Sequence, residues 1–492
     1  MLALGFSAGI PLLLLFGTLS VWLNEAGVNK STITFFSWAG LGYSFKFVWA
    51  PLIDQARLPL LTRWLGKRRA WLLLCQVLLL TTLALMACVD PSSPSDNNAA
   101  LTTMALLAVC LGFLSASQDI VIDALRIEMT PPEFMGLSSA SYQFGYRLAM
   151  IVSGAGAFRL AMYFGSTKDE YHYSAWQMTY WIMALMMLVG IVTTLLIKEP
   201  TQRRDALDST GSRELVKLFI IIVLPFIATF YLWNHYLLAP IDTKSLGQFP
   251  VFLLSIARLD LAMLVSYACV RPLIAQQWLS PTLAKSTYVE PVKEFFSRYP
   301  KKTIILLLLL IGFYRVSDLV LGAVANMFYQ DLGFTKAQFG DASKIFGLIM
   351  TIVGTFFGGA LVAWLGTMRT LFWGAVLSAI TNLLFMWLAN EGNNIIGLYG
   401  VICLDNLAAG IATTAFITLL SRLSNLEFTA MQYAIFSSIM LMLPTVMKGY
   451  SGTVVSWVGY PNFFLITTLI GLPVIFLVNL VSKELTLDEE KR

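Results

Sequence analysis

Apolar stretches about as long as a membrane is thick recur along nearly the whole of this chain. A helix needs about 20 predominantly apolar residues to cross the hydrocarbon core of a bilayer. Only 12% of the 492 residues are charged, whereas a soluble domain carries about 25%. We therefore predict an all-α polytopic membrane protein. Its fourteen predicted spans are 2–23, 33–53, 70–89, 101–124, 135–162, 175–197, 215–238, 250–272, 303–328, 339–365, 369–389, 395–420, 428–450 and 461–482.

Basic residues gather in every second connection between these spans. This distribution, and not one basic face, accounts for the net charge of +5 and argues against a nucleic-acid partner. Because basic loops stay in the cytoplasm, both termini are predicted to be cytoplasmic, which an even number of spans allows. The basic residues of these connections are Arg57, Arg63, Lys67, Arg68, Arg69, Arg126, Lys198, Arg203, Arg204, Lys285, Lys293, Arg298, Lys301 and Lys302.

The predicted spans fall into groups of six, two and six. The middle two form a hydrophobic hairpin, and the segment after it carries apolar residues at helical spacing with charged residues between them. That segment is predicted to lie as an amphipathic helix on the cytoplasmic surface, with a plain solvated linker as the alternative. The predicted domains are an N-terminal half (1–200), an extra two-helix hairpin (201–280), a cytoplasmic linker (281–302) and a C-terminal half (303–492).

A weak internal repeat relates the two groups of six. Glu133-Phe134 opens a span that contains Ser153-Gly154, and Glu427-Phe428 opens a span that contains Ser451-Gly452. A chance match between two apolar helices is the alternative. Duplicated six-helix halves with a binding site at the membrane midplane are typical of secondary transporters. We therefore predict the major facilitator fold, two six-helix halves with two extra helices between them.

The connection after the second predicted span carries candidate gating residues. Asp54 stands at the end of that span, and Arg68 and Arg69 follow after a turn. An acid at a helix end can cap a neighbouring helix or pair with an arginine, and so hold one conformation. The alternative is ordinary positive charge on the cytoplasmic side. Lys46, about two turns earlier, is a candidate for substrate binding, or it extends along apolar surface to the membrane interface.

The fourth predicted span contains two acids on one helical face. Asp119 and Asp123 are four residues apart, so they lie one turn apart on the same side. Two carboxylates this close in a low dielectric do not both ionise cheaply, which favours a proton carrier. The alternative is a structural ion pair of Asp123 with Arg126. The candidate binding residues around these acids are Gln118, Tyr142, Tyr146 and Arg147.

The second half also places charges within its predicted spans. Arg315 and Asp318 are three residues apart and share a face, and Asp318 is a further candidate for proton coupling. Arg315, Lys344, Asp405 and Asn406 are candidates for substrate binding. Charges within spans are costly, so they favour a wet cavity with both signs of charge, although structural pairs between helices are the alternative.

Enzyme activity is not expected. The chain has two histidines, His172 and His235, and neither a phosphate-binding loop nor a metal-spaced cluster of ligands. No cofactor and no metal are therefore predicted, and an ion gradient is the expected source of energy.

Several motifs resemble the AmpG family of muropeptide permeases. They are Gly5 to Leu12, Phe45 to Asp54, Gly66 to Leu72, Ser115 to Asp123, Gly145 to Leu148 with Ser153-Gly154, Phe313 to Asp318, Lys344 to Gly354 and Asn406 to Thr418. The resemblance covers most of the twelve core spans. The long loop after Asp54 is also similar to that of the family.

The resemblance implies proton-driven import of N-acetylglucosaminyl-1,6-anhydro-N-acetylmuramyl peptides across the bacterial inner membrane. This import would feed cell-wall recycling and signal β-lactamase induction. The implied partners are the muropeptide, protons and the lipid bilayer. The positions that match charged or polar positions of the family are Lys46, Asp119, Asp123, Arg147, Asp318, Lys344 and Asn406.

Two departures from the family pattern leave other functions open. Asp405 stands where a Glu is expected, and the extra hydrophobic pair lies between the halves and not at the C-terminus. The alternatives are a proton-coupled transporter of another anionic solute, such as acetyl-CoA, a siderophore or a peptide, and a membrane sensor that transports nothing.

Overall fold

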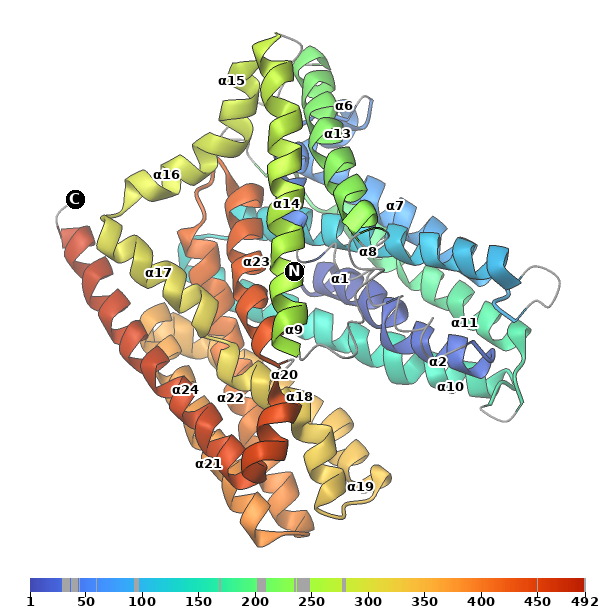
Figure 1. Ribbon diagram of the computed structural model, residues 1–492, viewed down its shortest axis with the longest axis vertical. Coiled ribbons are helices and arrows are strands. Elements are labelled where there is room, and N and C mark those ends of the chain that lie inside the picture. Colours follow the sequence, from blue (N-terminus) through green and yellow to red (C-terminus); the bar gives the residue numbers. More distant parts are fainter. Residues whose placement is uncertain are drawn as a thin grey trace.

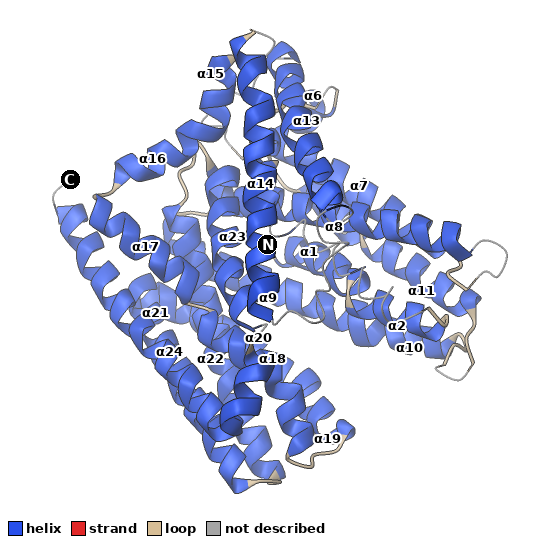
Figure 2. Ribbon diagram, in the orientation of Figure 1, coloured by secondary structure: helices blue, strands red, loops and turns tan. Residues whose placement is uncertain are grey.

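The computed structural model of the protein is helical, and the residues that it describes form no strand (Figure 2). Among those residues, nine helices are long and apolar enough to cross a membrane. The predicted multi-pass membrane fold is thereby confirmed, while the number of fourteen spans stays a prediction. The described residues are 1–28, 36, 43, 45–58, 60–92, 97–167, 170–200, 209–233, 236, 248–276, 280–448 and 450–490.

The first half follows the predicted spans up to residue 200, apart from the span 33–53, of which 33–35, 37–42 and 44 lie outside the described residues. Its helices form one bundle, drawn in blue to teal in Figure 1. They are α1 (Leu2–Leu15), α2 (Gly17–Glu25), α5 (Ala50–Gln55), α6 (Leu61–Leu65), α7 (Lys67–Ala87), α8 (Asn97–Met129), α9 (Met135–Ile151), α10 (Ala157–Tyr163), α11 (Tyr173–Met186) and α12 (Leu188–Leu196).

The second half forms another bundle, drawn in yellow to red in Figure 1. Every predicted span after residue 302 coincides with helical structure in it. Its helices are α17 (Lys301–Phe313), α18 (Val316–Asp331), α19 (Lys336–Gly340), α20 (Gly347–Leu365), α21 (Thr367–Glu391), α22 (Ile395–Leu423), α23 (Thr429–Lys448) and α24 (Ser451–Glu490).

Two further helices and a short linker connect the bundles. α13 (Ser209–Leu232) and α14 (Gln248–Ala275) pack against each other, and the Ser266 hydroxyl donates to the Ile222 carbonyl at 2.9 Å. After them come α15 (Pro281–Ala284), the π-helical turn Lys285–Val289 and α16 (Glu290–Arg298), which cross to the start of α17 (Figure 1). We call the segment from α15 to α16 the linker helices.

Equivalent turns in the two bundles support the internal repeat. Gly66 ends α6 with φ +86° and ψ 176°, and Gly366 ends α20 with φ +86° and ψ 164°. Each glycine opens the next helix of its bundle. Backbone with this positive φ strains a residue that has a Cβ, which explains why glycine stands at both turns. At Gly66 a Cβ would also lie 2.4 Å from the Glu199 side chain.

The bundles meet through α9 and α20, near the end of the molecule where the basic residues of α7 lie; we call this the basic end. A Cβ on Gly136 would lie 2.8 Å from Val362 Cγ1, and one on Gly359 would lie 2.9 Å from the Ala140 Cβ. Small residues therefore allow the two backbones to approach closely. Away from this contact the bundles diverge, so that α2 and α10 lie far from α18 and α19 (Figure 1).

Candidate functional site

Asp123, on α8, lies between two cations of the first half. Its carboxylate is 3.9 Å from Lys46 Nζ and 3.5 Å from Arg126 Nη2. The Arg126 guanidinium is fully buried and also donates to the Ser139 hydroxyl at 2.9 Å. The structure thus contains the ion pair between Asp123 and Arg126, which was the alternative to a proton carrier in the sequence analysis. Lys46 is the second cation beside Asp123. Burying an ion pair requires such additional partners, because desolvation offsets much of the attraction.

Asp119 lies one turn earlier on α8 and has fewer partners. Its side chain is buried, and its Oδ1 has no hydrogen-bond partner among the described residues. The neighbouring Gln118 accepts a 3.4 Å hydrogen bond from the Ser7 hydroxyl, while its Nε2 is likewise without a partner. A buried polar atom without a partner is costly, so it marks a place where a proton, a water or a ligand group can bind.

An aromatic side chain of the second half completes the group around Asp123. The ring centre of Tyr433, on α23, is 5.6 Å from the Arg126 guanidinium and 6.0 Å from Lys46 Nζ. The ring of Tyr142, on α9, lies 5.9 Å from the same guanidinium. Cations attract the faces of aromatic rings. Tyr433 therefore joins the charged group of the first half to the second half.

A second charged group lies at the break between α17 and α18. Arg315 Nη1 is 3.6 Å from Asp318 and donates to the Thr413 hydroxyl on α22. Asp405, also on α22, accepts a hydrogen bond from the Thr381 hydroxyl at 3.2 Å and interacts electrostatically with Asp318. The three charged side chains are half-buried. The structure therefore brings together the predicted residues Arg315, Asp318 and Asp405.

Arg147, on α9, carries a charge that no acid pairs with in the described part of the chain. Its Nη1 approaches only the Met150 sulfur, at 3.9 Å. Arg315, from the other half, acts on it electrostatically as a like charge. A half-buried guanidinium without an acidic partner, in the field of a second guanidinium from the other bundle, forms a place suited to an anion.

The other predicted binding residues are less closely associated. Asn406 donates to the Ile402 carbonyl and accepts from the Thr351 hydroxyl at 2.8 Å, so its amide nitrogen and its amide oxygen each have a partner. Tyr146 lies beside Tyr142, with 6.1 Å between ring centres. Lys344 is exposed, and it forms no ion pair within the described ranges. The structure does not bring Lys344 into either charged group.

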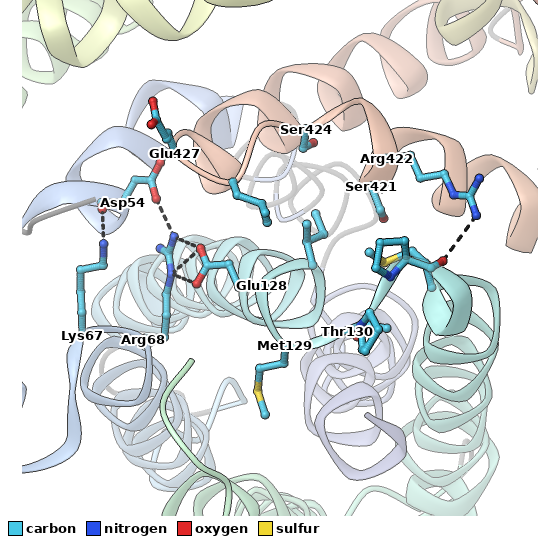
Figure 3. Close-up of a pocket in the computed structure, with 15 residues that line it drawn as sticks. Asp54, Lys67, Arg68, Glu128, Met129, Thr130, Ser421, Arg422, Ser424 and Glu427 are labelled. Carbon is cyan, nitrogen blue, oxygen red and sulfur yellow. Dashed lines mark hydrogen bonds and ion pairs between the residues drawn. The ribbon is translucent and has the colours of Figure 1, made fainter. Parts of the chain in front are cut away.

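Two of the predicted gating residues, Asp54 and Arg68, line a cavity of about 640 Å³ at the basic end (Figure 3). Arg68 Nη2 is 2.6 Å from Asp54, and its Nε is 3.1 Å from Glu128 at the end of α8. The neighbouring Lys67 donates to the Asp54 carbonyl at 2.9 Å. One guanidinium thus joins two acids from different spans. The other wall of the cavity includes Arg422, from α22 of the second half.

Arg69 has a different set of partners. Its side chain donates to the carbonyls of Thr194 and Leu195 at 2.9 and 2.7 Å. Glu199 accepts the backbone N–H groups of Arg68 and Arg69 at 2.8 and 3.0 Å, which caps the start of α7 with a negative charge. Arg69 therefore joins α7 to α12 and does not take part in the Asp54–Arg68 pair.

Sequence reasoning missed several residues of these groups. Tyr433 gave no signal, because one tyrosine in an apolar span resembles any other. Glu128 and Glu199 could have been found, since each is an acid within a basic connection. No group of three histidine, cysteine or acidic residues suited to a metal occurs among the residues searched, which were those that the structure describes.

Two helical bundles that meet beside half-buried charged side chains are the architecture of a secondary membrane transporter. The model of the Major Facilitator Superfamily matches residues 1–315. The solved structure of FucP, a major facilitator transporter in the outward conformation, is similar, with a TM-score of 0.57 and 12% identity over 98% of this chain and 97% of that one. The proton:xylose symporter XylE has a TM-score of 0.58 and 11% identity over 96% and 92% of the two chains.

Similarity in sequence is greater to two bacterial relatives. The putative transporter AmpG 4 of Rickettsia conorii is 31% identical over 96% of this chain and 94% of its own. The anhydromuropeptide permease of Escherichia coli K12 is 31% identical over 97% of this chain and 78% of its own. The chain therefore belongs to the AmpG family within the major facilitator superfamily, which confirms the resemblance found in its motifs.

Proposed function

We propose that this protein imports anhydromuropeptides, the N-acetylglucosaminyl-1,6-anhydro-N-acetylmuramyl peptides, across the bacterial inner membrane with a proton. The permease of E. coli, 31% identical over nearly the whole chain, is the observation that carries the substrate. A muropeptide carries carboxylates on its peptide, and the unpaired charge of Arg147, on which the like charge of Arg315 also acts, suits such an anion. No enzymatic step, metal or cofactor belongs to this proposal.

We assign the proton to Asp119. Its buried Oδ1 has no donor, so no hydrogen bond compensates a negative charge there, and a bound proton would remove that charge. Asp123, by comparison, is already held by Lys46 and Arg126. Asp318 and Asp405 lie beside Arg315, where a change in their protonation would alter the charge offered to the substrate.

We further propose that the basic end faces the cytoplasm and that both termini lie on that side, because positive residues are retained there. The close contact of α9 with α20 near that end would then close the cytoplasmic side. The bundles diverge away from this contact, which supports an outward-facing arrangement (Figure 1).

Uptake into liposomes tests the proposed function. Purified protein would be reconstituted, and labelled anhydromuropeptide would be added with and without an inward proton gradient. We expect accumulation only with the gradient. Uptake that a proton ionophore leaves unchanged would contradict proton coupling. If unlabelled muropeptide at millimolar concentration fails to bind, while acetyl-CoA, a siderophore or a simple peptide binds, the substrate is another anionic solute.

A further inference from the structure

We infer that the linker helices are a binding surface for anionic lipid headgroups, and that bound lipid holds the two bundles together at the basic end. This inference does not depend on the identity of the transported solute. It rests on two opposite faces of one short segment, one exposed and one that contacts both bundles.

The exposed face of the linker helices is apolar. Val289, Val292 and Phe296 are 50%, 38% and 52% exposed. Their spacing of three and four residues places them on one side of the helix. Three large apolar side chains in a row would be costly in water, and the segment ends where the membrane span α17 begins. The interface of the bilayer is the surface that such a face fits.

Lysines flank this apolar face. Lys285 and Lys293 are exposed, and neither forms an ion pair in the part of the chain that the structure describes. Lys301 and Lys302 follow at the start of α17 and are exposed as well, although Lys302 pairs with Glu484 at 2.6 Å. Apolar side chains bordered by lysines match a bilayer surface with negatively charged headgroups, which attracts each basic residue near it. A neutral surface would not make use of these charges.

The opposite face of the linker helices contacts the first half. The Tyr288 hydroxyl donates to the Val48 carbonyl at 2.7 Å, and the Thr287 hydroxyl donates to Gln55 at 3.2 Å. Val48 and Gln55 lie at the end of the second span, next to Asp54 of the gating pair. Movement of that span away from the second half would therefore pull on the linker.

The same face contacts the second half a turn later. Gln432 on α23 donates to the Pro291 carbonyl at 2.9 Å, and Asn425 donates to Glu294 at 2.8 Å. The rings of Phe295 and Phe436 are 5.0 Å apart. The linker helices thus bridge both bundles at the basic end. If the exposed face leaves the bilayer when the linker helices lose contact with one bundle, lipid binds only while both contacts are made. Bound lipid then stabilises the conformation in which the linker helices contact both bundles.

A quenching experiment on the full chain tests the lipid partner. A fluorescent amino acid replaces the exposed Ser297, and the protein is reconstituted in phosphatidylcholine vesicles containing headgroup spin-labelled phosphatidylglycerol or headgroup spin-labelled phosphatidylcholine. We expect stronger quenching by the anionic lipid, lost at high salt. In the Lys285→Gln/Lys293→Gln variant the apparent affinity for the anionic lipid should fall roughly fivefold for each lysine. The matched control is Lys198→Gln/Lys217→Gln, which removes two exposed lysines outside the linker.

The second part of the inference is tested by the distance between the bundles at the basic end. Spin labels at Arg63 and Arg369, both exposed, report it. We expect anionic vesicles to increase the fraction of molecules in which the two labels are a short distance apart. Phe296→Ser should remove that increase. Equal quenching by both lipids, or none, would overturn the lipid partner and favour a soluble protein on this face. Quenching without any change in distance would overturn the bridging role.

Discussion

The guanidinium of Arg126, fully buried in the first half, lies 5.6 Å from the ring centre of Tyr433 in the second. Lys46 approaches the same ring at 6.0 Å. One aromatic side chain therefore covers two cations of the other bundle, and it does so beside Asp123. This contact exists only while the bundles are together at the basic end, so it links the state of the charged group to the conformation of the protein.

Tyr433→Leu should open the basic end. The substitution removes the ring but keeps an apolar side chain, and a desolvated cation–ring contact contributes about 1–2 kcal/mol. We expect roughly a tenfold faster reaction of a cysteine placed at Ser421, which lines the cavity there, with a water-soluble thiol reagent. Tyr433→Phe keeps the ring and loses only the hydroxyl, which interacts with Asp123 and Arg126, so its rate should stay closer to the original than that of the Leu variant. Equal rates for the Leu and Phe variants would show that the ring does not hold the bundles together.

Asp119→Asn should abolish accumulation against a gradient. The amide has nearly the same shape but does not take up and release a proton at Oδ1, so coupling is lost while binding is retained. We expect exchange of labelled for unlabelled muropeptide to continue in proteoliposomes, and inside and outside concentrations to become equal. The control is Asp331→Asn, which changes an exposed acid at a helix end. Accumulation by the Asp119 variant would exclude this carboxylate as the proton carrier.

Arg147→Gln should weaken substrate binding. Removing a guanidinium that pairs with a carboxylate costs about 1.5–3 kcal/mol, or roughly 10- to 100-fold in affinity. Arg147→Lys should recover only part of the loss, because an ammonium keeps the charge but not the paired donors. Calorimetric titration of the purified protein measures the affinity. Arg159→Gln, an exposed arginine on α10, is the control. An unchanged affinity in the Gln variant would place the substrate away from Arg147.

Gly359→Leu should separate the bundles at the basic end. A Cβ at this position already lies 2.9 Å from the Ala140 Cβ and 3.2 Å from the Gly136 carbonyl oxygen, so a larger side chain requires α9 and α20 to move apart. Spin labels at Arg63 and Arg369 should report a longer distance. Gly400→Leu, where a Cβ meets nothing within 4 Å, should leave the distance unchanged. A short distance in both variants would mean that local repacking absorbs the side chain.

The hydrogen bonds that Glu294 accepts from Asn425 and Gln432 should make the attachment of α16 to the second half depend on pH. Burial raises the pKa of this carboxyl, but hydrogen bonds from Arg298, Asn425 and Gln432 outweigh it and hold the pKa below its ordinary value of 4.5. The attachment of α16 to the second half is therefore complete at pH values above 4.5, the ordinary pKa of the carboxyl. It is lost as the pH falls through the lowered pKa of Glu294.

Hydrogen exchange of the α16 amides, corrected for the intrinsic rate at each pH, measures this attachment. At pH 7, Glu294→Gln should lower the protection roughly fivefold, or about 1 kcal/mol after screening by solvent. The difference from the original protein should vanish at low pH. Glu290→Gln changes an exposed acid of the same helix and should have no effect. A loss of protection that persists equally at all pH values would exclude the charge of Glu294 as its cause.

Most of the fold could be predicted because membrane insertion depends on local composition. A run of about 20 apolar residues forms a helix in lipid whatever surrounds it, since every backbone group must be satisfied within the span. The predicted spans 2–23 and 303–328 were therefore readable from the chain alone. The pairs Asp119 with Asp123 and Arg315 with Asp318 were readable too, because each lies within one turn of helix.

Contacts between helices distant in sequence were decided only by the tertiary structure. Nothing in the local pattern placed Lys46 beside Asp123, or Tyr433 over Arg126, and Lys344 looked like a member of the site although it is exposed. The rotation of each span about its axis and the approach of one bundle to the other set these contacts. Both depend on packing summed over many small residues, such as Gly136 against Val362, and no single segment of the chain contains that information.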